Sequence, residues 1–397
     1  MKKIVFIYSK MIIGGSTTSL LSILDMLDRT KFDITLVLFW SGGELFNYIP
    51  DDVKVIVLLD TPLKERWHEI RKYLSIRYIF KYCYSYCLGW KIHSRELMGQ
   101  YLGFEYTRFF KKIKYSFDIG VSCMEFGPCV YLANSIIAKK KIAWIHRNYK
   151  EGHLVPNVES PAFEKMQSIV HVSDACKFAF DEIYPVFADR SIVIPNILSR
   201  NVILKRATEQ IDISIPMKKN GIRMVTTARI DFSSKAFDRT LKILNEIESE
   251  QGKQNFEWYI IGDGPDYEKL NELIKKYDLG KKIVLVGAMV NPYPLMRNMD
   301  VFLLLSRFEG KPISVTEAQI LGIPVIVTNY ASSYHQVQNG IDGIIVNNDE
   351  CSIKNVLISL LTGEIRLNEL HNNMINGKYS NEEVISIIEN ELFNVDI

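Results

Sequence analysis

Short apolar runs recur along the chain, and each is followed by a turn and by a segment whose apolar residues have helical spacing. In the first half of the chain these runs occupy residues 4–8, 34–39, 53–58, 119–123, 142–145, 169–172 and 192–194. Strands that are buried on both faces of a parallel sheet have continuous apolar runs of this length. The pattern therefore predicts a doubly wound α/β domain with helices on both faces of its sheet.

The same pattern restarts after a polar, irregular segment at residues 198–221. The later runs occupy residues 222–228, 258–261, 283–286, 301–305, 324–328 and 344–346. We therefore expect two Rossmann-like domains, at residues 1–197 and 198–375, that face a central cleft. Ligands of such sheets bind beyond the carboxyl ends of the strands, so this cleft is the expected binding site.

Residues 376–397 are expected to contain a C-terminal helix. Residues 381–393 have amphipathic spacing, Asn381 is a suitable N-cap, and acidic residues occupy the first turn. We expect this helix to cross back to the first domain and to tie the two domains together.

The composition is that of an ordinary globular protein. The 397 residues exceed the usual size of a single core, and 47% hydrophobic with 24% charged residues exclude a disordered chain. The apolar run at residues 4–8 is too short for a signal peptide. No stretch reaches the roughly 20 apolar residues of a membrane-spanning helix. The expected location is the cytoplasm, with any membrane contact peripheral.

Positive charge is concentrated between Lys64 and Lys150, where 17 basic residues stand against 6 acidic ones. Within this region, residues 72–91 interleave bases with aromatic residues and contain no acid. Such a composition is typical of a surface that lies against an anionic membrane. A helix pair with its aromatic residues in the core and its lysines in water explains the pattern equally well. RNA binding also fits a basic patch, but no nucleic-acid-binding motif accompanies it.

The six cysteines form no paired CxxC units. Cys83 and Cys87 would share one face of a helix, yet no second His or Cys pair follows them at zinc spacing. Reduced thiols are therefore expected, and no metal site.

Glu309 and Glu317 stand eight residues apart, on either side of a predicted helix start. Gly310, Lys311 and Pro312 have the composition of a loop that opens a helix with Pro in its first turn. The free N–H groups of a helix start bind anions, so the two carboxylates can hold hydroxyl groups on either side of a phosphate. This arrangement suits a nucleotide sugar, although acids at this spacing also occur on solvated helix faces.

Arg229 and Lys235 stand six residues apart on the loop after the first strand of the second domain. Without the acid pair, the two residues would be interpreted as cations on the protein surface. With the acid pair, they make the second domain resemble the retaining glycosyltransferases of family four, which have the two-Rossmann architecture called GT-B. The resemblance covers residues 222–346 well and the first domain more loosely. The acid pair corresponds to the EX7E motif of that family.

The resemblance implies a role for each of these charged residues. Glu309 would lie beside the donor sugar, and Glu317 would hydrogen-bond the ribose. Two fixed cations can stabilise the charge that builds up on a departing diphosphate, which is the role implied for Arg229 and Lys235. The helix start at Gly310, Lys311, Pro312 and Ile313 would bind the phosphates.

Other positions resemble the family's donor loops. Gly262 gives a tight turn close to a ligand, although a plain strand-to-helix turn needs the same residue. Met289 lies in the segment whose backbone typically meets the nucleobase. Gly15 and Ser16 resemble the GT-B loop that approaches the donor diphosphate, or they form a simple turn; the GxGxxG fingerprint is absent. His146 ends a strand where the family commonly has a His facing the donor sugar, although a single His is more often structural.

One departure from the family pattern and one missing motif affect the expectation. The family often has GlyGly and a Glu where this chain has Ser332–Gln336, which bears on donor specificity. No AspXAsp triplet, the metal signature of the other main glycosyltransferase fold, is present. The resemblance therefore implies a mechanism without a metal and without any cofactor beyond the nucleotide sugar.

The combined expectation is a cytoplasmic, anomer-retaining hexosyltransferase that uses a nucleotide diphosphate sugar, with UDP as the expected carrier. The basic region favours a lipid-linked saccharide acceptor at the inner face of the plasma membrane, as in capsule or surface-polysaccharide assembly. Two alternatives stay open: a nucleotide-sugar epimerase on the same scaffold, and a non-catalytic module that binds sugar nucleotides. The missing fingerprint disfavours a dehydrogenase.

Overall fold

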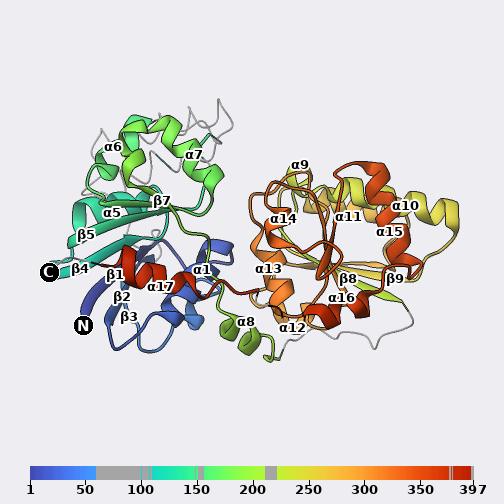
Figure 1. The fold of residues 1–397 in the computed structure, drawn as a ribbon, viewed down its shortest axis with the longest axis horizontal. Helices are drawn as coiled ribbons and strands as arrows, with labels where there is room; N and C mark the ends of the chain where they lie inside the picture. Colours follow the sequence, from blue (N-terminus) through green and yellow to red (C-terminus); the bar gives the residue numbers. More distant parts are fainter. Residues whose placement is uncertain are drawn as a thin grey trace, which may run out of the picture. The chain divides into compact units, whose positions relative to one another are not determined.

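The computed structural model describes residues 1–59, 100, 107, 110–147, 149–150, 156–210, 221–374, 377 and 379–394. The chain folds into two compact units (Figure 1). One comprises Met1–Ile197 with Glu382–Ile397, and the other comprises Leu198–Asn381. Each unit is a parallel sheet with helices on both faces, which confirms the predicted fold class. The basic, aromatic segment at residues 72–91 lies outside the described residues.

The described residues of the first unit form a seven-stranded sheet in the order β3-β2-β1-β4-β5-β6-β7. Its strands are β1 (Lys2–Tyr8), β2 (Phe32–Trp40), β3 (Lys54–Leu59), β4 (Ser116–Ser122), β5 (Ile137–Ile145), β6 (Ser168–His171) and β7 (Ser191–Val193). Each apolar run expected in this half of the chain falls on one of these strands. In the central strand, Ile4 is in register with Ile34 of β2 and with Ile119 of β4.

Alternate side chains of β1 enter two separate cores, as the two-residue period of a strand requires. Ile4 and Phe6 pack with α1 (Gly15–Met26) on one face. Val5 and Ile7 pack on the other face with α5 (Gly127–Ser135), α6 (Pro156–Phe163) and α7 (Asp174–Ile183). The described part of this unit also contains short 3-10 helical turns at Phe46–Tyr48 and Pro185–Arg190.

The chain returns to the first unit after residue 381. Here α17 (Val384–Ile387) continues into a π-helical turn at Ile388–Leu392, and Figure 1 shows α17 beside β1 and α1. The ring of Phe393 makes edge contacts with Phe6 and Phe32, at centroid distances of 6.2 and 5.9 Å. The expected Asn381 cap is wrong, because the side-chain oxygen of Asn381 accepts the N–H of Leu198 at 3.1 Å and the helix begins at Val384.

The second unit contains a six-stranded sheet in the order β10-β9-β8-β11-β12-β13. Its strands are β8 (Ile222–Thr227), β9 (Phe256–Ile261), β10 (Ile283–Gly287), β11 (Val301–Leu304), β12 (Val325–Thr328) and β13 (Gly343–Val346). The six apolar runs expected here also fall on strands.

Helices cover both faces of this second sheet. One core contains α10 (Phe237–Gln251), α11 (Tyr267–Lys276) and α15 (Glu350–Leu361). The other contains α8 (Arg200–Arg206), α12 (Tyr293–Met296) and α13 (Ile313–Ile320). Shorter helices are α9 (Phe232–Lys235), α14 (Ser333–Gln336) and α16 (Leu367–Met374).

Each sheet has a point at which the strand order reverses. In the second unit this point lies between β8 and β11, and in the first unit it lies between β1 and β4. Open α/β sheets bind ligands beyond the carboxyl ends of the strands at such a reversal. The loops after these four strands are therefore the expected ligand-binding positions.

Candidate active site

The reversal point of the second sheet is lined by residues that follow β8 and β11. Arg229 and Lys235 come after β8, whereas Ser306 and Glu309 come after β11. Because β8 and β11 are neighbours in the sheet, these two loops meet at one edge although Lys235 and Glu309 are 74 residues apart.

Lys235 and Glu309 form an ion pair in which Nζ donates to Oε1 at 2.5 Å. The hydroxyl of Ser306 donates to the same oxygen at 2.7 Å. The side chains of Lys235 and Glu309 are only 19% and 9% exposed, so water screens the pair less than it screens a surface salt bridge. Within the described ranges, no hydrogen bond is made to Oε2 of Glu309. The pair therefore presents an ammonium group beside a carboxylate oxygen that can still accept a hydrogen bond.

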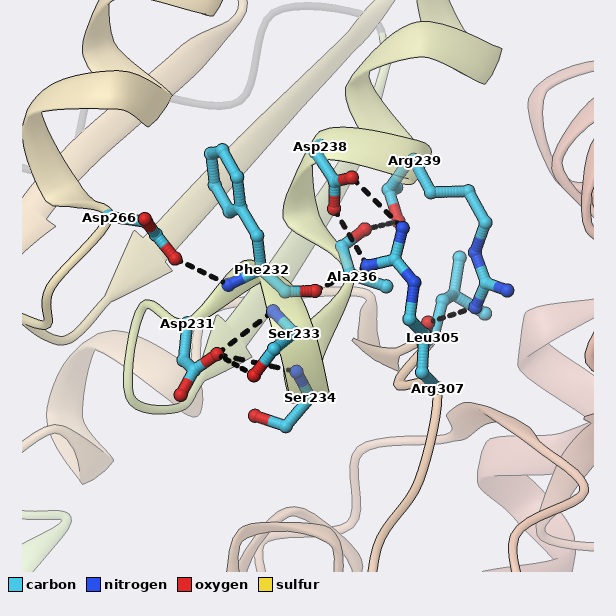
Figure 2. Close-up of polar contacts among 11 residues, drawn as sticks. Asp231, Phe232, Ser233, Ser234, Ala236, Asp238, Arg239, Asp266, Leu305 and Arg307 are labelled. Atoms are coloured by element: carbon cyan, nitrogen blue, oxygen red, sulfur yellow. Dashed lines mark hydrogen bonds and ion pairs between the residues drawn. The ribbon is translucent and has the colours of Figure 1, made fainter. Parts of the chain in front are cut away.

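A polar network holds the two loops together, and Figure 2 shows it. Both terminal nitrogens of Arg307 donate to the carboxylate of Asp238, each at 2.9 Å. The backbone N–H of Arg307 donates to the carbonyl of Ser234 at 2.7 Å, next to Lys235. Arg239 donates from Nη2 to the carbonyl of Leu305 at 2.8 Å. Two arginines thus fasten the loop after β11 to the segment that carries Lys235.

The sequence between Arg229 and α10 explains the sharp turn at Lys235. Asp231 accepts the N–H groups of Ser233 and Ser234 and caps α9. Ala236, the residue after Lys235, has the left-handed angles φ 57° and ψ 33°. A non-glycine residue in that region costs about 1 kcal/mol or more, so this conformation is held by the surrounding contacts.

Gly262 has a steric role in the same site. Its φ is +149°, and a Cβ at this position would lie 2.0 Å from the carbonyl oxygen of Ala228. Only glycine therefore allows the turn after β9 to pack on the loop that carries Arg229. Arg229 itself is exposed, and its side chain makes no hydrogen bond or ion pair with the part of the chain that the structure describes.

Helix α13 begins at Ile313, directly after Pro312, rather than with Pro312 in its first turn as expected. Gly310 and Lys311 are exposed in the preceding loop. The hydroxyl of Ser332 donates to the carbonyl of Gly310, and Nε2 of Gln336 donates to that of Pro312 at 2.8 Å. The segment that departs from the family pattern, Ser332–Gln336, thus supports the start of α13.

Glu317 is buried in α13 and has partners different from those of Glu309. Its Oε1 accepts the hydroxyl of Tyr293 at 2.7 Å. Burial raises the pKa of Glu317, whereas the hydrogen bond from Tyr293 and the charge of Arg206 act in the opposite direction. Met289, in the loop after β10, is half-buried against the core of the same face.

In the first unit, Gly15 and Ser16 form the first turn of α1, directly after the loop that follows β1. The hydroxyl of Tyr8, at the end of β1, shares hydrogen bonds with Ser16 Oγ at 2.8 Å and with Thr17 Oγ1 at 2.9 Å. The end of the strand is thereby fixed to the start of the helix.

His146 lies at the carboxyl end of β5, as expected, and a buried carboxylate stands next to it. Glu125 accepts the backbone N–H of His146 at 3.3 Å and Nε of Arg147 at 3.1 Å. Burial lowers the pKa of His146, while the charge of Glu125 and a hydrogen bond with Asn196 act in the opposite direction. His146 is thus favoured in its neutral form.

Glu125 is held in place by a strained turn. The next residue, Phe126, has φ 61° and ψ −119°, which a bulky side chain rarely adopts. The N–H of Phe126 donates to the buried carboxylate of Glu159 at 3.0 Å, and Gln100 and Tyr149 donate to the other oxygen of Glu159 at 3.1 Å each. Sequence reasoning found neither Glu125 nor Glu159, because neither belongs to a motif with fixed spacing.

Two further observations concern metals and membranes. In the described ranges, no group of three or more His, Cys, Asp or Glu side chains is placed to hold a metal ion. None of the helices that the structure describes is long and apolar enough to cross a membrane.

Comparison with known proteins shows which proteins parts of this chain are similar to. Residues 208–380 match the family model "Glycosyl transferases group 1". Over 126 residues the chain is 32% identical to UDP-Gal:alpha-D-GlcNAc-diphosphoundecaprenol alpha-1,3-galactosyltransferase of Escherichia coli, which covers 30% of this chain and 32% of that protein. It is 37% identical over 78 residues to the O-antigen biosynthesis glycosyltransferase WclY of Escherichia coli, which covers 19% of this chain and 22% of that protein.

The chain thus spans about a third, or less, of the length of these two curated relatives. The similarity in three dimensions extends further. The crystal structure of Anabaena Alr3699/HepE in complex with UDP-glucose matches 99% of both chains with a TM-score of 0.64 and 15% sequence identity. The two parallel-sheet units therefore have the GT-B fold, and the family match over residues 208–380 supports a glycosyltransferase.

Proposed function

We propose that the chain is a retaining glycosyltransferase that transfers a hexosyl unit from a UDP-sugar to a saccharide on a lipid carrier. The observation that carries this proposal is the shielded Lys235–Glu309 pair at the reversal point of the second sheet. UDP is the sugar carrier in the name of one relative, and the structural neighbour was crystallised with UDP-glucose. The relative's name also specifies a diphosphoundecaprenol-linked acceptor.

In the proposed reaction, the bond between the sugar C1 and the diphosphate oxygen breaks as the acceptor oxygen bonds to C1 on the same face. The acceptor's proton passes to the departing phosphate oxygen. Lys235 and Arg229 stabilise the negative charge that builds up on the diphosphate, with the N–H groups at the start of α13. No metal or protein nucleophile is required in this scheme.

The remaining groups orient the donor. The uncommitted Oε2 of Glu309 accepts a sugar hydroxyl, and Glu317 accepts a ribose hydroxyl. His146, whose ring also hydrogen-bonds Asn196, contacts a sugar hydroxyl as neutral imidazole in this scheme. In this proposal the turn at Gly262 lies close to the donor, and the segment of Met289 contacts the nucleobase. The loop of Gly15 and Ser16 approaches the diphosphate.

A cytoplasmic location with peripheral membrane contact is part of the proposal. It depends on the basic composition between Lys64 and Lys150, most of whose aromatic part lies outside the described residues. Flotation with vesicles of phosphatidylserine and phosphatidylcholine at low salt tests it. Absence of binding would remove the membrane contact from the proposal without affecting the donor site.

Slow donor hydrolysis tests the chemistry. The purified protein is incubated with a panel of UDP-, GDP- and ADP-sugars in the presence of EDTA, alongside Glu309→Ala and Lys235→Ala. Lys242→Ala is the matched control, because Lys242 and Glu350 form an ion pair whose side chains are 49% and 55% exposed. We expect one UDP-sugar to be hydrolysed by the wild type and the control, and the rate to fall at least about a hundredfold in the two site variants.

Each other outcome has a defined meaning. Isomerisation of the sugar without an acceptor would favour the epimerase. No turnover and no binding of any donor would favour the non-catalytic module.

A further inference from the structure

A buried polar chain links four segments of the second unit: the end of α8, the loop after β10, α12 and α13. Its members are Arg206, Tyr293 and Glu317, which are 3%, 2% and 8% exposed. A buried guanidinium is costly unless its charge and hydrogen bonds are used. The contacts of Arg206 therefore indicate why it is buried there.

Arg206 and the loop after β10 hold each other through two hydrogen bonds. Nη2 of Arg206 donates to the carbonyl of Val290 at 2.6 Å, and Nδ2 of Asn291 donates to the carbonyl of Arg206 at 2.7 Å. Each partner thus supplies one side-chain donor and one backbone acceptor. This reciprocal arrangement fixes the path of the loop relative to α8.

The same guanidinium reaches the acidic residue of α13 through an aromatic ring. Arg206 lies over the ring of Tyr293, with its central carbon 4.9 Å from the ring centroid. The hydroxyl of Tyr293 donates to Oε1 of Glu317 at 2.7 Å. The hydrogen bond fixes the carboxylate and commits one oxygen, while no hydrogen bond to Oε2 is made within the described ranges.

We propose that Tyr293 and Arg206 are positioning residues that set recognition of the nucleoside part of the donor. Tyr293 holds the Glu317 carboxylate so that Oε2 accepts a ribose hydroxyl. Arg206 holds Tyr293 and, at the same time, the loop that would meet the base. The inference deepens the proposed function and rests on it. One guanidinium thereby couples the ribose contact to the base contact.

Calorimetric binding of UDP and 2′-deoxy-UDP tests the inference without knowledge of the sugar. Wild-type protein should bind UDP about tenfold more tightly than 2′-deoxy-UDP. The deoxy analogue lacks the ribose hydroxyl that donates to the carboxylate of Glu317. In Tyr293→Phe, which keeps the ring and removes only the hydroxyl, this preference should fall below about threefold. Arg206→Met should weaken binding of both nucleotides, because it also releases the loop.

Tyr259→Phe is the matched control. Tyr259 is a buried tyrosine of the same unit whose hydroxyl donates to Glu257 at 3.2 Å. It should retain the wild-type preference, and thermal unfolding should show that all variants are folded. A merely structural role for Tyr293 would lower the melting temperature and leave the preference intact.

The outcomes separate the inference from the proposed function. If the wild type binds UDP and Tyr293→Phe keeps the full preference for ribose, the inference is overturned. A wild type that binds both nucleotides equally also overturns it. If the wild type binds neither nucleotide, the UDP-sugar function fails first, and the inference fails with it.

Discussion

Arg307 and Asp238 join the loop after β11 to the first turn of α10 through two parallel hydrogen bonds of 2.9 Å. Arg307 stands two residues before Glu309, and Asp238 stands three residues after Lys235. The ion pair of Arg307 with Asp238 therefore holds together the two segments that carry Lys235 and Glu309. A planar, bidentate contact fixes both distance and orientation, which a single hydrogen bond does not.

Arg307→Lys is expected to lower kcat for donor hydrolysis by roughly ten- to a hundredfold with a smaller change in KM. Lysine keeps the charge but loses the two-pronged contact, so Glu309 is less well placed against Lys235. Steady-state kinetics with the donor found in the screen measures the effect. Arg366→Lys is the control, since Arg366 and Glu369 form an ion pair with side chains that are 76% and 63% exposed. Equal kinetics in the two variants would contradict the positioning role.

Gly262→Ala is expected to destabilise the second unit by roughly 2–3 kcal/mol and to weaken UDP binding. The added Cβ would meet the carbonyl oxygen of Ala228 at 2.0 Å, so the loop that carries Arg229 has to move. Urea unfolding and calorimetry measure the two effects. Gly280→Ala is the control, because no heavy atom other than those of Gly280 and its two chain neighbours lies within 4 Å of its Cβ position. A stable Gly262→Ala with normal UDP affinity would show that the turn tolerates a side chain.

Glu159 is expected to make the first unit less stable as the pH rises from about 4.5 to about 7. Burial raises the pKa of Glu159 from 4.5 to about 7 in the folded chain. Below pH 4.5 Glu159 is protonated in both the folded and the unfolded chain, so its full contribution to the free energy of unfolding is present. Between pH 4.5 and pH 7 Glu159 is protonated mainly in the folded chain. The free energy of unfolding therefore falls as the pH rises, by roughly 3 kcal/mol in total at neutral pH.

The comparison of wild type with Glu159→Gln isolates this contribution. Gln cannot titrate, so the difference in unfolding free energy between the two proteins should change with pH over that window. Burial lowers the pKa of His171 to about 4, which acts with the opposite sign in both proteins and cancels in the difference. A difference that stays constant from pH 4.5 to pH 7 would show that Glu159 titrates normally.

Glu125→Gln is expected to lower the pKa of His146 further. The carboxylate of Glu125 favours the protonated imidazole, and its removal leaves burial as the main influence. The proton chemical shifts of the imidazole, followed with pH in the nuclear magnetic resonance spectrum, report this pKa. A spectrum of His146→Gln assigns the signal. An unchanged or higher pKa in Glu125→Gln would show that the carboxylate does not act on His146.

The strands could be predicted because a parallel sheet that is covered on both faces leaves a continuous apolar run for each of them. The order of the strands in the sheet cannot be predicted from these apolar runs. The pairing of Lys235 with Glu309 depends on β8 and β11 being neighbours, which only the folded sheet shows. The resemblance to a family placed both residues in a site without giving their contact.

Other parts of the site could not be predicted, because their partners are far apart in the sequence. The hydroxyl of Tyr293 in α12 donates a hydrogen bond to Glu317 in α13, 24 residues later in the sequence. Glu159 accepts the N–H of Phe126, which is 33 residues earlier in the sequence. The C-terminal helix was expected from its amphipathic spacing, but the side chain of Asn381 binds Leu198 and the helix begins three residues later. A local pattern reports which residues prefer a helix, whereas tertiary contacts decide where it begins.

The first unit is assembled from two stretches of chain, with the whole second unit between them. A nascent chain that has emerged from the ribosome as far as residue 381 has all of the second unit but lacks residues 382–394, which cover one face of the first unit together with α1. Phe6 and Phe32 then remain without the ring of Phe393. The second unit can therefore complete its folding during synthesis, whereas the first gains its full set of contacts only after residues 382–394 have been made.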